Sequence, residues 1–204
     1  MMKLRFVVVG LFLLVLLSCV NRQVRIKLGF VHPPAGLHFG LLYLDDPIDL
    51  RKEPNIVGVI KDADGERINK YYIAEQGVLS KKVKYFTLQT VSRTGLKLVE
   101  KREDKPVLSV TINDFMITNT GLIDKILKSS NYGVLIFNID ILFQLKKDDV
   151  VLWRYNFKMS EKIPTSSKSD PVEFERIIQK ALTKMYSELT AEVISQSFLS
   201  HIRN

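Results

Sequence analysis

The sequence predicts an α+β fold: a mainly antiparallel sheet with two amphipathic helices packed on one face. The first observation is a strict alternation of apolar and polar side chains on both sides of a turn at 146–149, which is typical of a sheet with one covered and one wet face. The second is helical spacing of apolar residues in two segments, one beginning near Val78 and one near Asp170. Two helices covering one face of the sheet bury both sets of apolar side chains economically.

The composition fits one globular domain of ordinary size. The 204 residues are 46% hydrophobic, with 10 glycines and 7 prolines, and no segment has low complexity. We divide the chain into a signal peptide at 1–18, a lipidated tether at 19–27 and a single α+β domain at 28–204.

The N-terminus has the pattern of a cleavable leader. Lys3 and Arg5 precede an apolar run, 6–17, that is broken only by Gly10. As a helix this run would span about 18 Å, too short for a bilayer core of about 30 Å. A short apolar run behind positive charge indicates a signal peptide.

The end of the run resembles a bacterial lipobox. Leu16 and Leu17 are followed by Ser18 and by Cys19, the only cysteine of the chain. The resemblance implies transfer of a diacylglyceryl group to the Cys19 sulfur, cleavage between Ser18 and Cys19, and acylation of the new amine. The alternatives are an ordinary signal peptide with a chance cysteine, or an uncleaved anchor.

The residue after the cysteine and the net charge bear on the location. Val20 stands where known sorting rules of two-membrane bacteria place aspartate for inner-membrane retention, so the outer membrane is predicted. Without Lys3 and Arg5 the mature chain keeps 28 basic and 22 acidic side chains, a net charge of +6. That charge favours anionic lipid headgroups or envelope polyanions, whereas no basic stripe interleaved with aromatics predicts nucleic-acid binding.

The first half of the domain contains short strand-like segments. The apolar run 37–44 predicts a buried strand that ends or bulges at 45–47, where two aspartates precede a proline. Segments 55–60 and 67–73 flank a turn at 62–65 that ends in Asp-Gly, which is a hairpin signal.

The following segment changes to helical spacing and ends at Gly95, which suits the left-handed position after a helix. A strand is expected at 96–99. The apolar residues at helical spacing are Val78, Leu79, Val83, Phe86 and Thr90.

A basic surface is predicted beside this helix. Its residues are Lys81, Lys82 and Lys84, joined by Lys101, Arg102 and Lys105. Such a surface would contact anionic lipid or polymer. The alternative is an ordinary solvated helix face.

Three long strands are predicted in the second half, with a polar connection at 118–132 between the first two. The strand 107–117 places Leu108, Val110 and Ile112 on one face. The next strand and the returning strand have buried faces made of Leu135, Phe137, Ile139, Ile141, Phe143 and Leu145, and of Val151, Trp153, Tyr155, Phe157 and Met159. Arg154, Asn156 and Lys158 point the other way, and Trp153 is expected in the core.

A polar loop at 163–169 leads into a long final helix. Asp170 can cap this helix, Pro171 fits its first position and Glu173 completes a capping box. The apolar stripe consists of Phe174, Ile177, Ile178, Ala181, Leu182, Met185, Leu189 and Val193.

No catalytic, metal or cofactor site is predicted. His32 and His38 lack a third ligand, and the turn at 62–65 lacks the glycine and glutamate of a calcium loop. The adjacent Asp45 and Asp46 would point to opposite faces of a strand, so they do not converge as an acid–base pair.

Several short motifs together resemble the YajG-like bacterial lipoproteins. They are Asp49-Leu50-Arg51, the segment 55–60, Asp64-Gly65, a helix ending at Gly95, and Leu152-Trp153 after a charged turn. The resemblance extends in pattern to the LptE-like and ABC-transport auxiliary lipoproteins, and it transfers no catalytic residue.

We therefore expect a lipid-anchored envelope protein that acts as a non-enzymatic binding or scaffolding module in envelope maintenance or transport. Its membrane contact would be the lipid on Cys19, with an envelope protein or anionic lipid as partner. One alternative is an auxiliary subunit of a lipid-trafficking ABC system. A second is a small envelope hydrolase, for which no nucleophile and base are recognisable.

Overall fold

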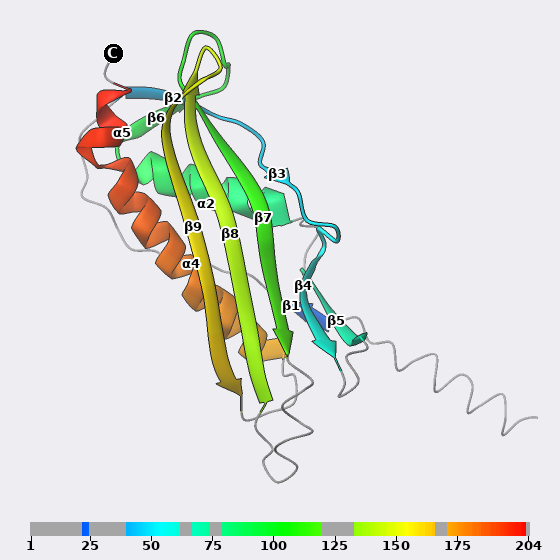
Figure 1. Cartoon of the computed structure of the whole chain (residues 1–204). Helices are drawn as coiled ribbons and strands as arrows, with labels where there is room; N and C mark the ends of the chain where they lie inside the picture. Colours follow the sequence, from blue (N-terminus) through cyan, green and yellow to red (C-terminus); the bar gives the residue numbers. More distant parts are fainter. Residues whose placement is uncertain are drawn as a thin grey trace, which may run out of the picture.

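One curled, mixed sheet and three helices form the part of the chain that this computed structural model describes, namely residues 22–24, 40–61, 67–73, 79–119, 133–165 and 171–202 (Figure 1). The strands are β1 (Arg22–Val24), β2 (Gly40–Leu44), β3 (Ile48–Asp49), β4 (Ile56–Lys61), β5 (Arg67–Ile73), β6 (Leu96–Val99), β7 (Val107–Asn119), β8 (Gly133–Lys147) and β9 (Val150–Thr165). The helices are α2 (Leu79–Arg93), α4 (Pro171–Val193) and α5 (Gln196–Ser200).

The α+β class is confirmed, and the longest ladders are antiparallel as predicted, but the sheet also contains parallel pairs that were not predicted and is therefore mixed. The strands follow the order β1-β5-β4-β7-β2-β6, with β3 and β8 also beside β7 and β9 beside β8. The pairs β4–β5, β7–β8 and β8–β9 are antiparallel, whereas β1, β2, β3 and β4 each have a parallel neighbour. Alternation along a strand shows which face is buried but not the direction of its partner, so the sequence pattern could not detect the parallel pairs.

The alternation in β7, β8 and β9 is largely confirmed. The predicted inward residues of β7 and β8 are buried, as are Trp153 and Phe157 of β9. The prediction that Val151 belongs to the buried face is wrong, because 46% of this residue is exposed. The pairing of β8 with β9 shifts between Leu145 and Lys146, so Val151 and Trp153 do not lie on the same face. The prediction that a polar loop begins at Ile163 is also wrong, because β9 continues to Thr165.

A bulge also changes the phase of β7. Pairing with β8 shifts between Ile112 and Asp114, so Phe115 and Ile117 continue the buried face. Asp114 thereby moves to the outer face, opposite Asp140 of β8.

Both predicted helices are confirmed. All eight predicted residues of the α4 stripe are buried, and Gly95 has the positive φ of 85° that ends α2. The short helix α5 was not predicted; the Ser195 hydroxyl accepts a hydrogen bond from the Phe198 backbone N–H at its start.

The core lies between the sheet and the helices. The two long helices, α2 and α4, lie behind β7, β8 and β9 in Figure 1. Two aromatic contacts join the sheet to the helices: Tyr71 of β5 stacks on Phe174 of α4 at 4.1 Å, and Trp153 of β9 meets Phe198 of α5 at 4.7 Å. A third joins the two long helices, where Phe86 of α2 meets Tyr186 of α4 at 5.9 Å. Among the described residues, no helix is both long and apolar enough to cross a bilayer.

Candidate functional site

The predicted lipidation site adjoins the first described strand. Ser18 and Cys19 lie outside the described residues, as do His32, His38 and the turn at 62–65. Within the segment predicted as a tether, Arg22–Val24 forms β1 and pairs in parallel with β5, with Arg22 opposite Tyr71. Val20 and Asn21 alone separate Cys19 from this strand.

The lysines of α2 lie near the start of the helix. Lys81 is exposed, whereas Lys82 and Lys84 are half-buried, and the Lys84 ammonium forms an ion pair with Asp46 just beyond the end of β2. Strand β2 ends at Leu44, which confirms the predicted interruption by the two aspartates.

Two further residues of the predicted basic surface, Arg102 and Lys105, line a hollow of mixed charge. Arg102 lies 3.3 Å from an Asp149 carboxylate oxygen. The hollow has a volume of about 370 Å³ and is lined by Arg102, Glu103, Asp104, Lys105, Val107, Lys146, Asp148 and Asp149. Because both acids and bases line it, the hollow has no single charge with which to select a ligand.

The turn between β8 and β9 positions two of the four acids of this hollow. Asp148 and Asp149 have φ values of 51° and 62°, as the two-residue turn of a tightly twisted hairpin requires. Aspartate tolerates this conformation better than most residues. Among the described residues, no group of three His, Cys, Asp or Glu side chains is arranged to hold a metal ion.

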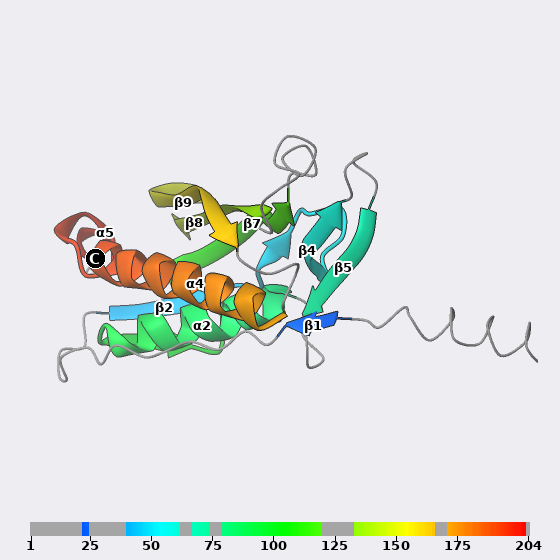
Figure 2. The same ribbon diagram turned by 90° about the horizontal axis from the view of Figure 1, so that it is seen from below.

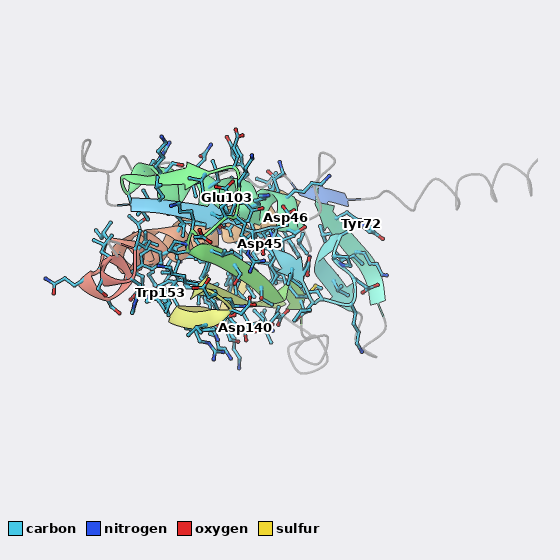
Figure 3. All side chains as sticks on the ribbon, turned by 90° about the horizontal axis from the view of Figure 1, so that it is seen from above. Asp45, Asp46, Tyr72, Glu103, Asp140 and Trp153 are labelled. Atoms are coloured by element: carbon cyan, nitrogen blue, oxygen red, sulfur yellow. The ribbon has the colours of Figure 1, made fainter. Side chains whose placement is uncertain are left out.

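A pair of carboxylates faces outward from β7 and β8, and the sequence pattern had not indicated it. Asp140 accepts a hydrogen bond from Asn113 at 3.1 Å and lies 3.1 Å from the Lys158 ammonium. Figure 3 shows Asp140 on the outer side of the strands and Trp153 on the side of α5. Burial is the main cause that raises the pKa of Asp114, and nearby Asp140 adds to it, against the hydrogen bond from the Phe115 backbone and the charge of Arg51.

Arg51 occupies an enclosed polar site in the loop between β3 and β4. Its side chain is 4% exposed and that of Asp49 7%, and the guanidinium holds the carboxylate through two bonds of 2.9 and 2.8 Å. It also donates to the carbonyls of Ile56 at 2.8 Å, Phe115 at 3.1 Å, and Pro54. The Asp49-Leu50-Arg51 motif therefore closes the loop before β4 and ties it to β7.

Two tyrosines connect the helices to their surroundings. Burial is the main cause that raises the pKa of Tyr186 and of Tyr155. Tyr186 donates to the Val83 carbonyl of α2 at 3.2 Å, and Tyr155 donates to Glu188 of α4 at 2.9 Å. Both hydroxyls therefore have packing roles at the helix contacts.

Comparison with known proteins shows the fold and no more. No family model matches the sequence, and no curated protein matches it. A Xanthomonas campestris protein of the DUF330 family aligns with a TM-score of 0.61 and 14% identity, over 88% of this chain and 96% of that one. A neuraminyllactose-binding hemagglutinin homolog from Helicobacter pylori aligns with a TM-score of 0.52 and 12% identity, over 86% of this chain and 98% of that one.

A minor lipoprotein from Acinetobacter baumannii also matches, over 77% of this chain and 94% of that one. Its TM-score is 0.41 and its identity 6%. The α+β architecture is thus shared with bacterial proteins, while the YajG-like and LptE-like resemblances stay predictions.

Proposed function

We propose that this chain is a lipid-anchored bacterial envelope lipoprotein that works as a non-enzymatic binding or scaffolding module. The observation that carries the proposal is the single cysteine, Cys19, placed directly after Ser18 at the end of a short apolar run. Two or three acyl chains on one residue hold a domain stably at a membrane, whereas one chain holds it only marginally.

The roles of the polar clusters support the non-enzymatic part of the proposal. The Arg51 guanidinium is bonded to the Asp49 carboxylate and to backbone carbonyls, and the Asp140 carboxylate is bonded to Lys158 and Asn113. A general acid or base needs a free proton-transfer position that substrate can reach. These described groups are instead committed to holding strands and loops together.

The outer membrane is the proposed location, because Val20 follows the cysteine. The longest edge strand of the described sheet is a place where a partner strand could bind. Among the described residues, β9 is bonded only to β8, so the other edge of this 16-residue strand has no strand beside it. An envelope protein that adds a strand there, or an anionic lipid surface, would suit a scaffolding module.

The anchor is tested by labelling cells that express the full chain with a fatty-acid analogue. Cys19→Ser should abolish labelling and release or mislocalise the protein, because the acceptor sulfur is gone. Ser160→Ala, a change at an exposed serine of β9, is the control and should label normally. Undiminished labelling of Cys19→Ser would contradict the proposal.

The mode of binding is tested by co-purification from native membranes at low and high salt. Electrostatic binding should weaken strongly with salt, since exposed charges are screened over about 8 Å at physiological ionic strength. Strand pairing or apolar contact should resist salt. Recovery of no partner or lipid, together with a hydrolytic activity that a point mutation removes, would favour an enzyme instead.

A further inference from the structure

The distance from the lipid anchor to the fold is short. Three residue steps join Cys19 to Arg22, the first residue of β1, and an extended chain covers at most about 11 Å in that length. Strand β1 is bonded to β5 and packs against α4, so it is part of the domain. If Cys19 carries acyl chains in a bilayer, β1 is held close to the headgroups.

Helix α2 lies on the same side of the molecule as β1. Figure 2 shows α2 and β1 along one side, with α4 between α2 and the strands β8 and β9. The inner side of α2 faces α4, because Val83 and Phe86 are buried and both contact Tyr186. The opposite, outer side of α2 therefore points away from the core. It forms part of the same side of the molecule as β1 (Figure 2).

The outer side of α2 has the composition of a surface that rests on lipid headgroups. Lys81, Tyr85 and Leu88 follow each other at intervals of four and three residues, so they share one face. Tyr85 is 53% and Leu88 41% exposed, and Lys81 is exposed. The helix contains no acidic residue, and tyrosine, leucine and lysine together are typical of helices that lie in the membrane interface.

We propose that α2 lies on the anionic phospholipid leaflet that holds the Cys19 acyl chains, with β1 beside it and the β8–β9 turn directed away. This inference rests on the proposed lipidation of Cys19. Lys81 and, from the edge of this face, the half-buried Lys82 meet the lipid phosphates, and Tyr85 and Leu88 lie at headgroup depth. The contact is shallow, because both apolar side chains are only partly exposed. The β9 edge and the outer face of β7 to β9 then face partners rather than lipid.

The test uses full-length lipidated protein in vesicles of phosphatidylcholine and phosphatidylglycerol. Cys19 is the only native cysteine and its sulfur is occupied by lipid, so a nitroxide can be attached to a single introduced cysteine. Leu88→Cys reports on α2, with Tyr85→Cys as a second position. Val150→Cys, at an aliphatic residue that is 60% exposed beside the β8–β9 turn, is the matched control.

We expect collisions with a water-soluble nickel chelate to be several-fold less frequent at positions 85 and 88 than at position 150. Replacing Lys81 and Lys82 by glutamate should restore access at position 88 while the protein still floats with the vesicles. Equal access at all three positions in floating protein would overturn the orientation. Equal protection after the lysine replacements would overturn the role of anionic lipid. Failure of the wild-type protein to float would instead contradict the lipid anchor.

Discussion

The two ends of this sheet are specified in different ways. Strands β7, β8 and β9 have 13, 15 and 16 residues and follow an inward–outward alternation that is interrupted by one pairing shift in β7 and one in β9. Strands β1, β4 and β5 have three, six and seven residues, and long-range side-chain contacts hold the β4–β5 region in place. Arg51 reaches the Phe115 carbonyl across 64 positions of sequence, and Tyr71 of β5 stacks on Phe174 of α4. Local pattern specifies the first region, whereas individual tertiary contacts specify the second.

The largest expected effect is in the long-strand region. Trp153→Ala should lower the free energy of unfolding by about 3–5 kcal/mol, because it removes the indole packed against Phe198 and leaves a cavity. Arg154→Ala, at the exposed neighbouring position, should change it by no more than about 0.5 kcal/mol. Denaturant unfolding of both variants is the measurement. Equal effects would show that the alternation does not decide the stability of β9.

The second effect is in the short-strand region. Arg51→Met should cost about 3 kcal/mol, because the Asp49 carboxylate stays buried without its partner. Adding Asp49→Asn removes the buried charge and should recover part of the loss. The same unfolding measurement tests both variants. A double variant no more stable than Arg51→Met would mean that the loop carbonyls, and not the charge, need Arg51.

A smaller loss is expected at Gly58 of β4. A Cβ atom there would lie 2.5 Å from the Phe174 ring and 3.2 Å from the Tyr71 Cβ, so Gly58→Ala should cost about 2 kcal/mol by overpacking. Adding Phe174→Leu should relieve the clash and reduce the further cost of Gly58→Ala in a double-mutant cycle. Full additivity of the two losses would contradict this account of the close approach.

The smallest effect concerns the outward carboxylates. The folded chain raises the pKa of Asp114 above its ordinary value of 3.8, mainly by burial, so ionised Asp114 destabilises the fold above its folded pKa. Asp114→Asn should therefore stabilise the protein at pH 7, by no more than about 0.5 kcal/mol because solvent screens this partly exposed carboxylate, and the difference should vanish as the pH falls below 3.8. Melting temperatures across this pH range test it. Asp140→Asn, which weakens contacts to Lys158 and Asn113, should destabilise instead.

The same contrast explains what could be predicted from the sequence. The buried faces of β8 and α4 follow from periodicity alone, since every predicted inward residue is buried. The outward positions of Val151 and Asp114 were not predicted, because a one-residue shift in strand pairing reverses the inward–outward alternation. No residue in the sequence marks where these shifts occur. The parallel partners of β7 depend on how distant segments return to the sheet, which alternation does not record.

The functional surfaces were only partly predictable for the same physical reason. Lys84 and Arg102 were recognisable as basic, but their acidic partners, Asp46 and Asp149, are 38 and 47 positions away. The role of Arg51 required knowing which carbonyls surround it. Helix α5 had a usable local signal, the capping serine at position 195, whereas the three residues of β1 depend on β5 and α4.

The central claim is that Cys19 carries the membrane anchor next to β1, and mass spectrometry of the mature N-terminus tests it most directly. Protein extracted from its own membranes and cut with trypsin should yield a first peptide of four residues, Cys19 to Arg22. The account predicts that this peptide carries a diacylglyceryl group on the cysteine sulfur and, where the amine is also modified, a third acyl chain. A mature chain that begins with unmodified Cys19, or that retains Met1 through Ser18, would contradict it.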